Sequence, residues 1–223
     1  VKPLKQSGAE IVSTNNHLPI KISKGIIGPI KFTERTNSAQ VKSSLMIAAL
    51  GLDVYSKIHY NKQTRDHTEN LLKYLQCNIR NNHYINIKKT DFKKGFNISI
   101  PGDMSNASFI IAATILSPGS KVIIKNLLYN KSRNGFLEAI INMGAKIEVS
   151  NIQSKHGENI CDLHVSYSPN LENINIDKEN IISLIDEIPI LAVLATQANG
   201  QMLISGGEEL RTKESDRLNA IYV

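Results

Sequence analysis

Three apolar, alanine-rich runs recur along the chain, and each has the length of a short helix. They cover residues 37–51, 104–116 and 185–198, and each begins with small or polar residues that can cap a helix. Each run is apolar nearly all round, which predicts a helix that is buried on every side. Each ends at or near a glycine, and Pro189 falls in the first turn of the third helix, where a missing N–H costs least. We expect all three helices to lie inside the fold, between sheets.

The same succession of elements follows each of these runs. The pattern predicts a short strand, then a more amphipathic helix, then further strands. The strands that follow directly are predicted at residues 56–60, 121–124 and 201–204, and the second helices start near 64–69, 132–135 and 213–216. The further strands are predicted at residues 78–80, 84–87, 97–100, 146–149 and 162–165. Repetition at intervals of roughly 65–80 residues predicts an α/β fold built from copies of one unit, with helices packed on sheets.

The turn at Pro101-Gly102-Asp103 is the best candidate for a domain boundary, so we expect residues 1–100 and 101–223 to belong to different domains. The chain lacks an initiator methionine and stops inside a predicted helix, which indicates an internal fragment of a longer protein. It contains no apolar run of about 18 residues, so we predict no membrane span. No signal peptide is visible.

Composition narrows the class of ligand. The net charge of +6 suits anionic partners, but the lysines are scattered, aromatic residues make up 5%, and no nucleic-acid motif is recognised. We therefore expect small anionic ligands rather than nucleic acid. Cys77 and Cys161 make no CxxC pair and the six histidines form no close cluster, so we predict no metal site and a reducing, cytoplasmic setting.

Two predicted helix starts in the first half of the chain carry groups that can hold an anion. Helix N-termini expose N–H groups and a partial positive charge, which suits phosphate or carboxylate. Ser38 and Gln40 add neutral donors at one start, and Arg65 stands at another, where its guanidinium can grip an oxyanion with two hydrogen bonds. Simple capping explains Ser38 and Gln40 equally well. A surface salt bridge with Asp66 or Glu69 explains Arg65 equally well.

Asp186 and Glu214 are the candidate acid and base residues. Each lies at a predicted helix start near lysine and arginine, where a carboxylate can stay ionised and accept a proton. Lys213 and Arg217 add positive charge for an anionic substrate or transition state. The alternatives are that Asp186 is an N-cap, which is compatible with the first role, and that the charges at residues 208–217 form a solvated, salt-bridged helix start.

Five segments, taken in order, resemble the 5-enolpyruvylshikimate-3-phosphate synthase (3-phosphoshikimate 1-carboxyvinyltransferase) family. They are Ser-Ala-Gln-Val-Lys-Ser at residues 38–43, Thr-Arg-Asp-His-Thr-Glu at 64–69, Pro-Gly-Asp-Met-Ser at 101–105, Asp-Glu-Ile-Pro at 186–189 and Leu-Arg-Thr-Lys-Glu-Ser-Asp-Arg at 210–217. The order and spacing agree along essentially the whole chain. One such motif is a weak signal, whereas five in order are very specific.

The resemblance implies an α/β, two-domain enolpyruvyl transferase fold. Each domain would hold three βαβαββ-type units with buried parallel helices, arranged like an inside-out barrel. Residues 1–100 would be part of the second, upper domain and residues 101–223 part of the first, lower domain, both incomplete. The implied reaction moves the enolpyruvyl group of phosphoenolpyruvate to the 5-hydroxyl of shikimate 3-phosphate and releases phosphate. The family needs no metal or organic cofactor, and a cytoplasmic monomer is implied for the complete protein.

The resemblance also assigns roles to individual residues. The residues implied to hold shikimate 3-phosphate are Ser38, Ala39, Gln40, Arg65, Asp186 and Lys213. Gln40 and Arg217 should contact phosphoenolpyruvate. Asp186 should act as proton acceptor, and Glu214 should take part in proton transfer at the phosphoenolpyruvate methylene. Ser-Ala-Gln, rather than Ser-Ser-Gln, is one of the known forms of this motif in the family, and it leaves one hydroxyl to be replaced by a backbone contact.

Family elements that complete the site should lie before Val1 and beyond Val223, so we expect this piece to be inactive by itself. Two other functions stay open. The sister enzyme that adds enolpyruvyl to UDP-N-acetylglucosamine shares the fold and mechanism, although the segments at residues 65–69 and 213–217 favour the shikimate enzyme. A non-catalytic anion-binding module is the second alternative. The presence of Asp186 and Glu214 argues against it, because a binder gains nothing from a carboxylate facing an anion.

Overall fold

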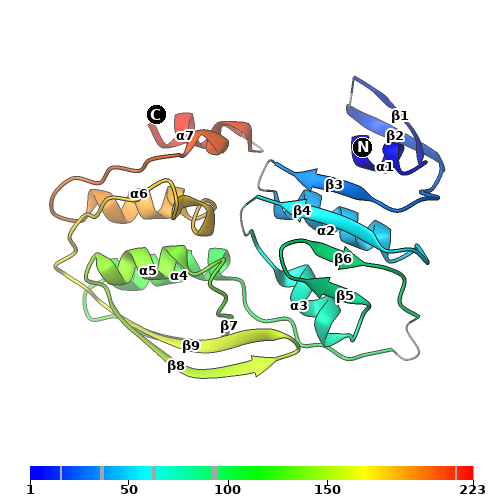
Figure 1. The fold of residues 1–223 in the computed structure, drawn as a ribbon. Coiled ribbons are helices and arrows are strands. Elements are labelled where there is room, and N and C mark those ends of the chain that lie inside the picture. The colour runs from blue at the N-terminus through cyan, green and yellow to red at the C-terminus, as the bar shows by residue number, and fades with distance from the viewer. Residues whose placement is uncertain (16, 36–37, 62–63, 92–94, 214, 223) are drawn as a thin grey trace. The chain divides into compact units, whose positions relative to one another are not determined.

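The computed structural model describes residues 1–15, 17–35, 38–61, 64–91, 95–213 and 215–222, and the chain divides into two compact units (Figure 1). Unit 1 spans Val1–Ile98 and unit 2 spans Ser99–Val223. This division lies just before the turn that the sequence marked at residues 101–103. The assignment of each unit to a domain of a longer protein stays a prediction.

Unit 1 contains a hairpin and a four-stranded sheet with two helices. Its elements are α1 (Lys2–Gln6), β1 (Glu10–Thr14), β2 (His17–Lys24), β3 (Lys31–Glu34), α2 (Ala39–Ala49), β4 (Ser56–Tyr60), α3 (His67–Tyr74), β5 (Ile79–Asn81) and β6 (Ile85–Ile87). Strands β1 and β2 pair antiparallel, and the second sheet has the order β3-β4-β6-β5 with β3 and β4 parallel. Helix α2 contacts β4 and α3 contacts β5, so both helices pack on this sheet.

Unit 2 contains an antiparallel sheet and a stack of helices. Its elements are α4 (Met104–Leu116), β7 (Lys121–Leu128), α5 (Gly135–Asn142), β8 (Lys146–Lys155), β9 (Glu158–Ser166), η1 (Ile181–Ser183), α6 (Ile188–Thr196), η2 (Glu208–Thr212) and α7 (Arg217–Tyr222). The sheet has the order β7-β9-β8. Helices α4 and α5 lie between this sheet and α6, and α4 contacts strands on one side and α6 on the other (Figure 1).

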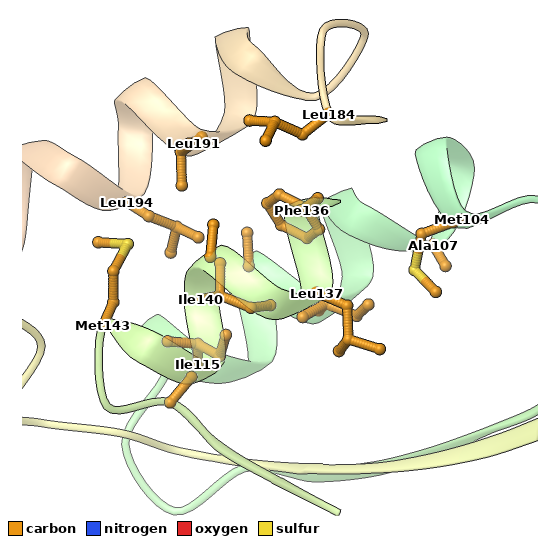
Figure 2. Close-up of a cluster of buried hydrophobic side chains, with 14 of the residues drawn as sticks. Met104, Ala107, Ile115, Phe136, Leu137, Ile140, Met143, Leu184, Leu191 and Leu194 are labelled. Atoms are coloured by element: carbon orange, nitrogen blue, oxygen red, sulfur yellow. The ribbon is translucent and has the colours of Figure 1, made fainter. Parts of the chain in front are cut away.

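The core of unit 2 is one apolar cluster shared by these layers. Figure 2 shows Leu191 and Leu194 of α6 pointing toward Phe136 and Ile140 of α5, with Ile115 of α4 below them. All five side chains are fully buried. Because such interiors are close-packed, the cluster holds the starts of the three helices in a defined arrangement.

The predicted succession of helix, strand, helix, strand, strand is confirmed in both units. It runs α2, β4, α3, β5, β6 in unit 1 and α4, β7, α5, β8, β9 in unit 2. The third helix also forms, as α6, with Pro189 in its first turn as predicted. The repeating hydrophobic pattern was therefore sufficient to place most of the helices and strands of these repeats.

Two predicted strands are wrong. Residues 97–100 join no sheet of the described chain, and Ile100 is exposed. Residues 201–204 make only isolated parallel bridging near Ile204, where the segment meets Ile176. The Leu203 N–H donates to the side-chain oxygen of Asn175 at 3.1 Å instead of to a backbone carbonyl, so the ladder does not extend past this point. A strand forms only where a neighbouring strand can continue the ladder.

The prediction that the apolar helices are buried on every side is correct for one face only. Ile47 of α2, Phe109 and Ile110 of α4 and Val193 of α6 are all about half exposed or more, from 48% to 62%. Within its own unit, each helix packs on the sheet or on another helix through its opposite face. The hydrophobic pattern therefore predicted that more of each helix surface is buried than is found in the described chain.

Asp162 of β9 forms hydrogen bonds to residues at two β-bulges of the unit 2 sheet. The register between β9 and β7 shifts between Ile124 and Leu127 of β7. The register between β9 and β8 shifts between Ser150 and Gln153 of β8. Asn126 and Asn151 lie at these shifts with φ of 54° each. The Asp162 carboxylate accepts a hydrogen bond from the Asn126 backbone N–H at 2.9 Å and another from the Asn151 side-chain amide at 3.1 Å. One carboxylate thus satisfies the Asn126 N–H that one bulge leaves outside the ladder and also holds the Asn151 side chain at the other.

We predict that Asp162→Asn lowers the thermal unfolding midpoint at neutral pH, because an amide cannot accept both bonds. The hydrogen bond from Asn126, followed by that from Asn151, lowers the pKa of Asp162. A depressed folded-state pKa contributes stability above the unfolded pKa of about 3.9, and that stability is lost as the pH falls. The difference between wild type and variant, followed by circular dichroism, should be constant above about pH 5 and shrink toward pH 3.

Asp177→Asn is the control, since Asp177 is an exposed aspartate of the same unit outside the sheet. It should change the midpoint less at every pH. A difference for Asp162→Asn that stays the same across the whole pH range would contradict a role for the ionised carboxylate.

Candidate active site

The starts of three helices in unit 2 meet at one guanidinium, that of Arg133. Its Nη2 lies 3.0 Å from Asp103 Oδ1 and 3.7 Å from Glu187 Oε1, and its Nη1 lies 3.4 Å from Asp186 Oδ2. Nη2 also donates to the Ser105 hydroxyl, and that hydroxyl donates to Glu187. Asp103 and Ser105 belong to the start of α4, while Asp186 and Glu187 directly precede α6. Arg133 itself lies two residues before α5.

This guanidinium lies almost entirely out of water. The Arg133 side chain is 8% exposed and the Glu187 side chain 2%. A buried charge is tolerated only when opposite charges and hydrogen bonds surround it. Arginine suits this place because its planar fork can direct five N–H donors at several acceptors at once. The cluster therefore behaves as one network, in which each member depends on the others.

Gly135, the first residue of α5, permits this arrangement. A Cβ on Gly135 would lie 2.1 Å from the Ser183 hydroxyl and 2.9 Å from the Ser183 carbonyl carbon. Only a residue without a side chain lets the start of α5 approach η1 so closely. Since η1 leads directly into Asp186, this close approach brings Arg133 within reach of that carboxylate.

The second side of Asp186 faces two further cations. Arg217 Nη1 lies 3.4 Å and Lys213 Nζ 4.0 Å from Asp186 Oδ1. Lys213 also pairs with Glu209 at 3.0 Å. The Asp186 side chain is 25% exposed, so it remains accessible from solvent despite these neighbours. The structure thus brings together the three predicted site residues that it describes in unit 2.

Two expectations for this region need correction. Asp186 is not the N-cap of α6, because that position belongs to Glu187, which makes no capping hydrogen bond. The Asp186 carboxylate is turned toward the three cations instead. The last helix begins at Arg217 rather than near Lys213. Asp216 precedes it and accepts a hydrogen bond from the Asn219 N–H at 3.0 Å, which is a capping contact. Glu214, the second proposed acid or base residue, lies outside the described residues.

In unit 1, the predicted site residues lie at the starts of α2 and α3. The Ser38 hydroxyl accepts a hydrogen bond from the Val41 N–H at 3.3 Å, so the capping role expected for Ser38 is confirmed. Ala39 is partly buried and Gln40 is exposed in the first turn of α2. Arg65 is partly exposed and directly precedes Asp66, the N-cap of α3.

The starts of α2 and α3 lie side by side. The Ser43 and Thr68 hydroxyls share a hydrogen bond at 2.8 Å, and Lys42 Nζ lies 2.6 Å from Glu69 Oε1. Glu69, one of the two acids expected as a salt-bridge partner of Arg65, forms an ion pair with Lys42. The residues expected to bind one substrate therefore share one edge of unit 1.

A sequence model of the family of EPSP synthase (3-phosphoshikimate 1-carboxyvinyltransferase) matches residues 1–223. The chain belongs to the EPSP synthase family. The 3-phosphoshikimate 1-carboxyvinyltransferase of Oceanobacillus iheyensis is 40% identical over 224 residues, which cover 99% of this chain and 52% of that protein. The enzyme of the same name from Persephonella marina is 39% identical over 225 residues, with 98% and 52% covered. The chain spans about half the length of the curated relatives it matches.

Solved structures agree with the fold expected for the EPSP synthase family. EPSP synthase from Acinetobacter baumannii superposes with a TM-score of 0.84 at 32% identity, covering 99% of this chain and 51% of that one. The enolpyruvyl transferase NikO from Streptomyces tendae gives a TM-score of 0.64 at 11% identity and covers 91% of this chain. The second likeness concerns the fold alone. The predicted enolpyruvyl transferase fold is thereby confirmed.

Sequence reasoning missed Arg133 as a site residue of this EPSP synthase family member. A signal for it was present in the repeat. Arg65 precedes the N-cap Asp66 of α3, and Arg133 holds the same place before Asn134, the N-cap of α5. Comparing the two copies position by position would have selected Arg133 as the counterpart of Arg65.

The remaining reactive groups do not contribute to this site. Burial, with a smaller effect of the Asp162 charge, raises the pKa of the Cys161 thiol to about 11. Burial also raises the pKa of Cys77. Both thiols are therefore protonated and poorly reactive at neutral pH. Across the described ranges, no group of three or more His, Cys, Asp or Glu side chains is placed to hold a metal ion. Nor is any helix in those ranges long and apolar enough to cross a membrane.

We predict that Arg133→Met lowers the free energy of unfolding by about 3–5 kcal/mol, the cost of breaking a buried ion pair from one side. The cause is Glu187, which would keep its charge in the interior without the guanidinium. The double variant Arg133→Met/Glu187→Gln should recover part of this loss. Urea unfolding followed by circular dichroism measures both.

Arg211→Met provides the control for a lost arginine. Arg211 pairs with Asp216 at 3.0 Å, but its side chain is 59% exposed, and exposed pairs contribute little. An equal loss in Arg211→Met and Arg133→Met would contradict the special position of the buried guanidinium.

Proposed function

We propose that the complete protein transfers the enolpyruvyl group of phosphoenolpyruvate to the 5-hydroxyl of shikimate 3-phosphate. The match of the EPSP synthase family to all 223 residues carries this proposal. The position of Asp186 between Arg133, Lys213 and Arg217 supports it, since a partly exposed carboxylate surrounded by cations suits proton transfer beside an anionic substrate.

Shikimate 3-phosphate would be held by residues of both units. In unit 1 these are Ser38, Ala39, Gln40 and Arg65, at the starts of two adjacent helices. Helix starts offer N–H groups to a phosphate, and Arg65 adds a cation that can bind its oxygens in pairs. In unit 2 the sugar-like hydroxyls would meet Asp186 and Lys213. Phosphoenolpyruvate would contact Gln40 and Arg217.

The chemistry proceeds by addition and then elimination. The 5-hydroxyl oxygen forms a bond to C2 of phosphoenolpyruvate, the hydroxyl proton passes to Asp186, and C3 gains a proton to become a methyl group. Elimination breaks the bond from C2 to the phosphate oxygen, and C3 returns a proton to restore the double bond. Glu214 is proposed for the proton transfers at C3. Lys213 and Arg217 would stabilise the negative charge of the intermediate.

Further expectations belong to the same proposal. The partners would be the two small anionic substrates, with no nucleic acid and no membrane. The complete protein would work in the cytoplasm as a monomer without a metal or organic cofactor. These statements rest on the family resemblance and stay predictions.

Calorimetric titration of the complete protein tests this function against its two alternatives. We predict that shikimate 3-phosphate binds and that UDP-N-acetylglucosamine does not. Adding phosphoenolpyruvate to the first complex should release inorganic phosphate. Binding of UDP-N-acetylglucosamine would favour the sister transferase. Anion binding with no phosphate release would favour a non-catalytic module.

We predict that Asp186→Asn and Glu214→Gln each lower kcat by about 10²–10⁴-fold, the usual contribution of general acid–base catalysis. Both substitutions keep the shape of the side chain and remove the proton acceptor. Shikimate 3-phosphate should still bind, because the residues of unit 1 are unchanged. Steady-state phosphate release measures the loss, and calorimetry measures the binding.

Asp103→Asn is the matched control for Asp186→Asn, because Asp103 also pairs with Arg133. It should cause a smaller fall in kcat, since it disturbs the same guanidinium without removing the proposed base. Full activity of Asp186→Asn would refute its role. For Glu214→Gln, undiminished exchange of solvent deuterium into the phosphoenolpyruvate methylene would do the same.

A further inference from the structure

Unit 1 contains a fully buried ion pair between its two site-bearing helices. Lys42 of α2 and Glu69 of α3 are each 2% exposed, and Lys42 Nζ lies 2.6 Å from Glu69 Oε1. The ammonium also lies 5.2 Å from the centre of the Tyr60 ring, on β4. The short ionic contact does not have hydrogen-bond geometry, and both Glu69 carboxylate oxygens are buried with no hydrogen-bond partner in the part of the chain that the structure describes.

Stability alone does not account for this pair. Removing two charges from water costs several kcal/mol per ion, and the attraction repays the cost only when every lone pair is satisfied. Here neither carboxylate oxygen of Glu69 has a hydrogen bond within the described residues. Apolar side chains of similar volume often serve equally well or better at such places.

Unit 2 places apolar residues at the corresponding positions. Counted from the N-caps of the paired helices, Lys42 corresponds to Ala107 of α4, and Glu69 corresponds to Leu137 of α5. Both Ala107 and Leu137 lie in the buried apolar cluster of unit 2. The repeated architecture therefore tolerates an apolar pair at these positions, and the charged pair is specific to unit 1.

The pair connects the two sets of proposed substrate-binding residues in unit 1. Lys42 lies in the first turns of α2, and its backbone N–H donates to the Ser38 carbonyl at 3.2 Å. Glu69 lies in the first turn of α3, four residues after Arg65. A buried charge is strongly destabilised when it is separated from its partner, so the ion pair penalises any displacement between the starts of α2 and α3. An apolar pair carries no such charge penalty.

We propose that Lys42 and Glu69 are positioning residues, which hold Ser38 and Gln40 of α2 in register with Arg65 beside α3 so that one phosphorylated substrate can meet all three. This inference rests on the proposed function. Neither Lys42 nor Glu69 touches the substrate, because both side chains are buried. Their effect reaches the site through the helix starts.

The test replaces the pair by the apolar solution of unit 2. In the complete protein, Lys42→Met/Glu69→Leu should keep the thermal unfolding midpoint close to that of wild type. The KM for shikimate 3-phosphate should rise about tenfold, the factor expected when one hydrogen bond is placed out of reach. The KM for phosphoenolpyruvate and kcat should change much less.

Lys89→Met/Asp53→Leu is the matched control, because Lys89 and Asp53 form an exposed ion pair of unit 1 at 3.6 Å. It removes the same charges and should leave both KM values unchanged. If the buried double variant does not fold, Glu69→Gln keeps the shape of the side chain and should raise the same KM in the same selective way.

Two results would overturn the inference: an unchanged KM for shikimate 3-phosphate in a folded variant, or an equal rise in both KM values. Arg65→Ala separates this outcome from failure of the proposed function. If the wild type turns over both substrates and Arg65→Ala selectively raises the KM for shikimate 3-phosphate, the proposed function stands, whatever the result for the Lys42–Glu69 variants. If wild type does not turn over shikimate 3-phosphate, the proposed function fails first.

Discussion

A guanidinium taken out of water has to be surrounded by acceptors, and in unit 2 this requirement determines where three helices begin. Arg133 forms ion pairs with carboxylates at the starts of α4 and α6. The same two helix starts are joined by the hydrogen bond from Ser105 to Glu187, which lie 82 residues apart in the sequence. The apolar cluster behind them sets the distances between the helices. The ionic network then fixes the positions of the helix starts, because a buried charge tolerates little displacement from its partners.

The same network gives Asp186 two different sides. One oxygen faces the buried Arg133, which holds the carboxylate in place, and the other faces Lys213 and Arg217 toward solvent. A group that must take up a proton beside an anion needs both a fixed position and access. The arrangement offers both for the role proposed for Asp186, since the interior partner fixes the carboxylate and its other oxygen is partly exposed.

The two units solve the packing of paired helices in different ways. Unit 2 places Ala107 and Leu137 in its apolar cluster, whereas unit 1 places the Lys42–Glu69 ion pair at the corresponding positions. Each unit also carries an arginine directly before the N-cap of its second helix, Arg65 or Arg133. Arg133 is buried among carboxylates, but Arg65 remains partly exposed. One repeated framework thus turns the same arginine inward in one unit and leaves it accessible in the other.

The sequence by itself determined the repeating order of helices and strands, the position of Pro189, and the family, because periodicity and motif order are local properties that need no tertiary contact. It also indicated Asp186, Lys213 and Arg217 as candidate site residues. Only the tertiary structure decided that Glu187 rather than Asp186 holds the N-cap position of α6, that Arg133 pairs with carboxylates from two other helix starts, and that residues 201–204 make only an isolated bridge in the described chain. Each of these depends on groups distant in sequence that approach one another, and such pairing is set by packing and charge in three dimensions. No local pattern encodes it.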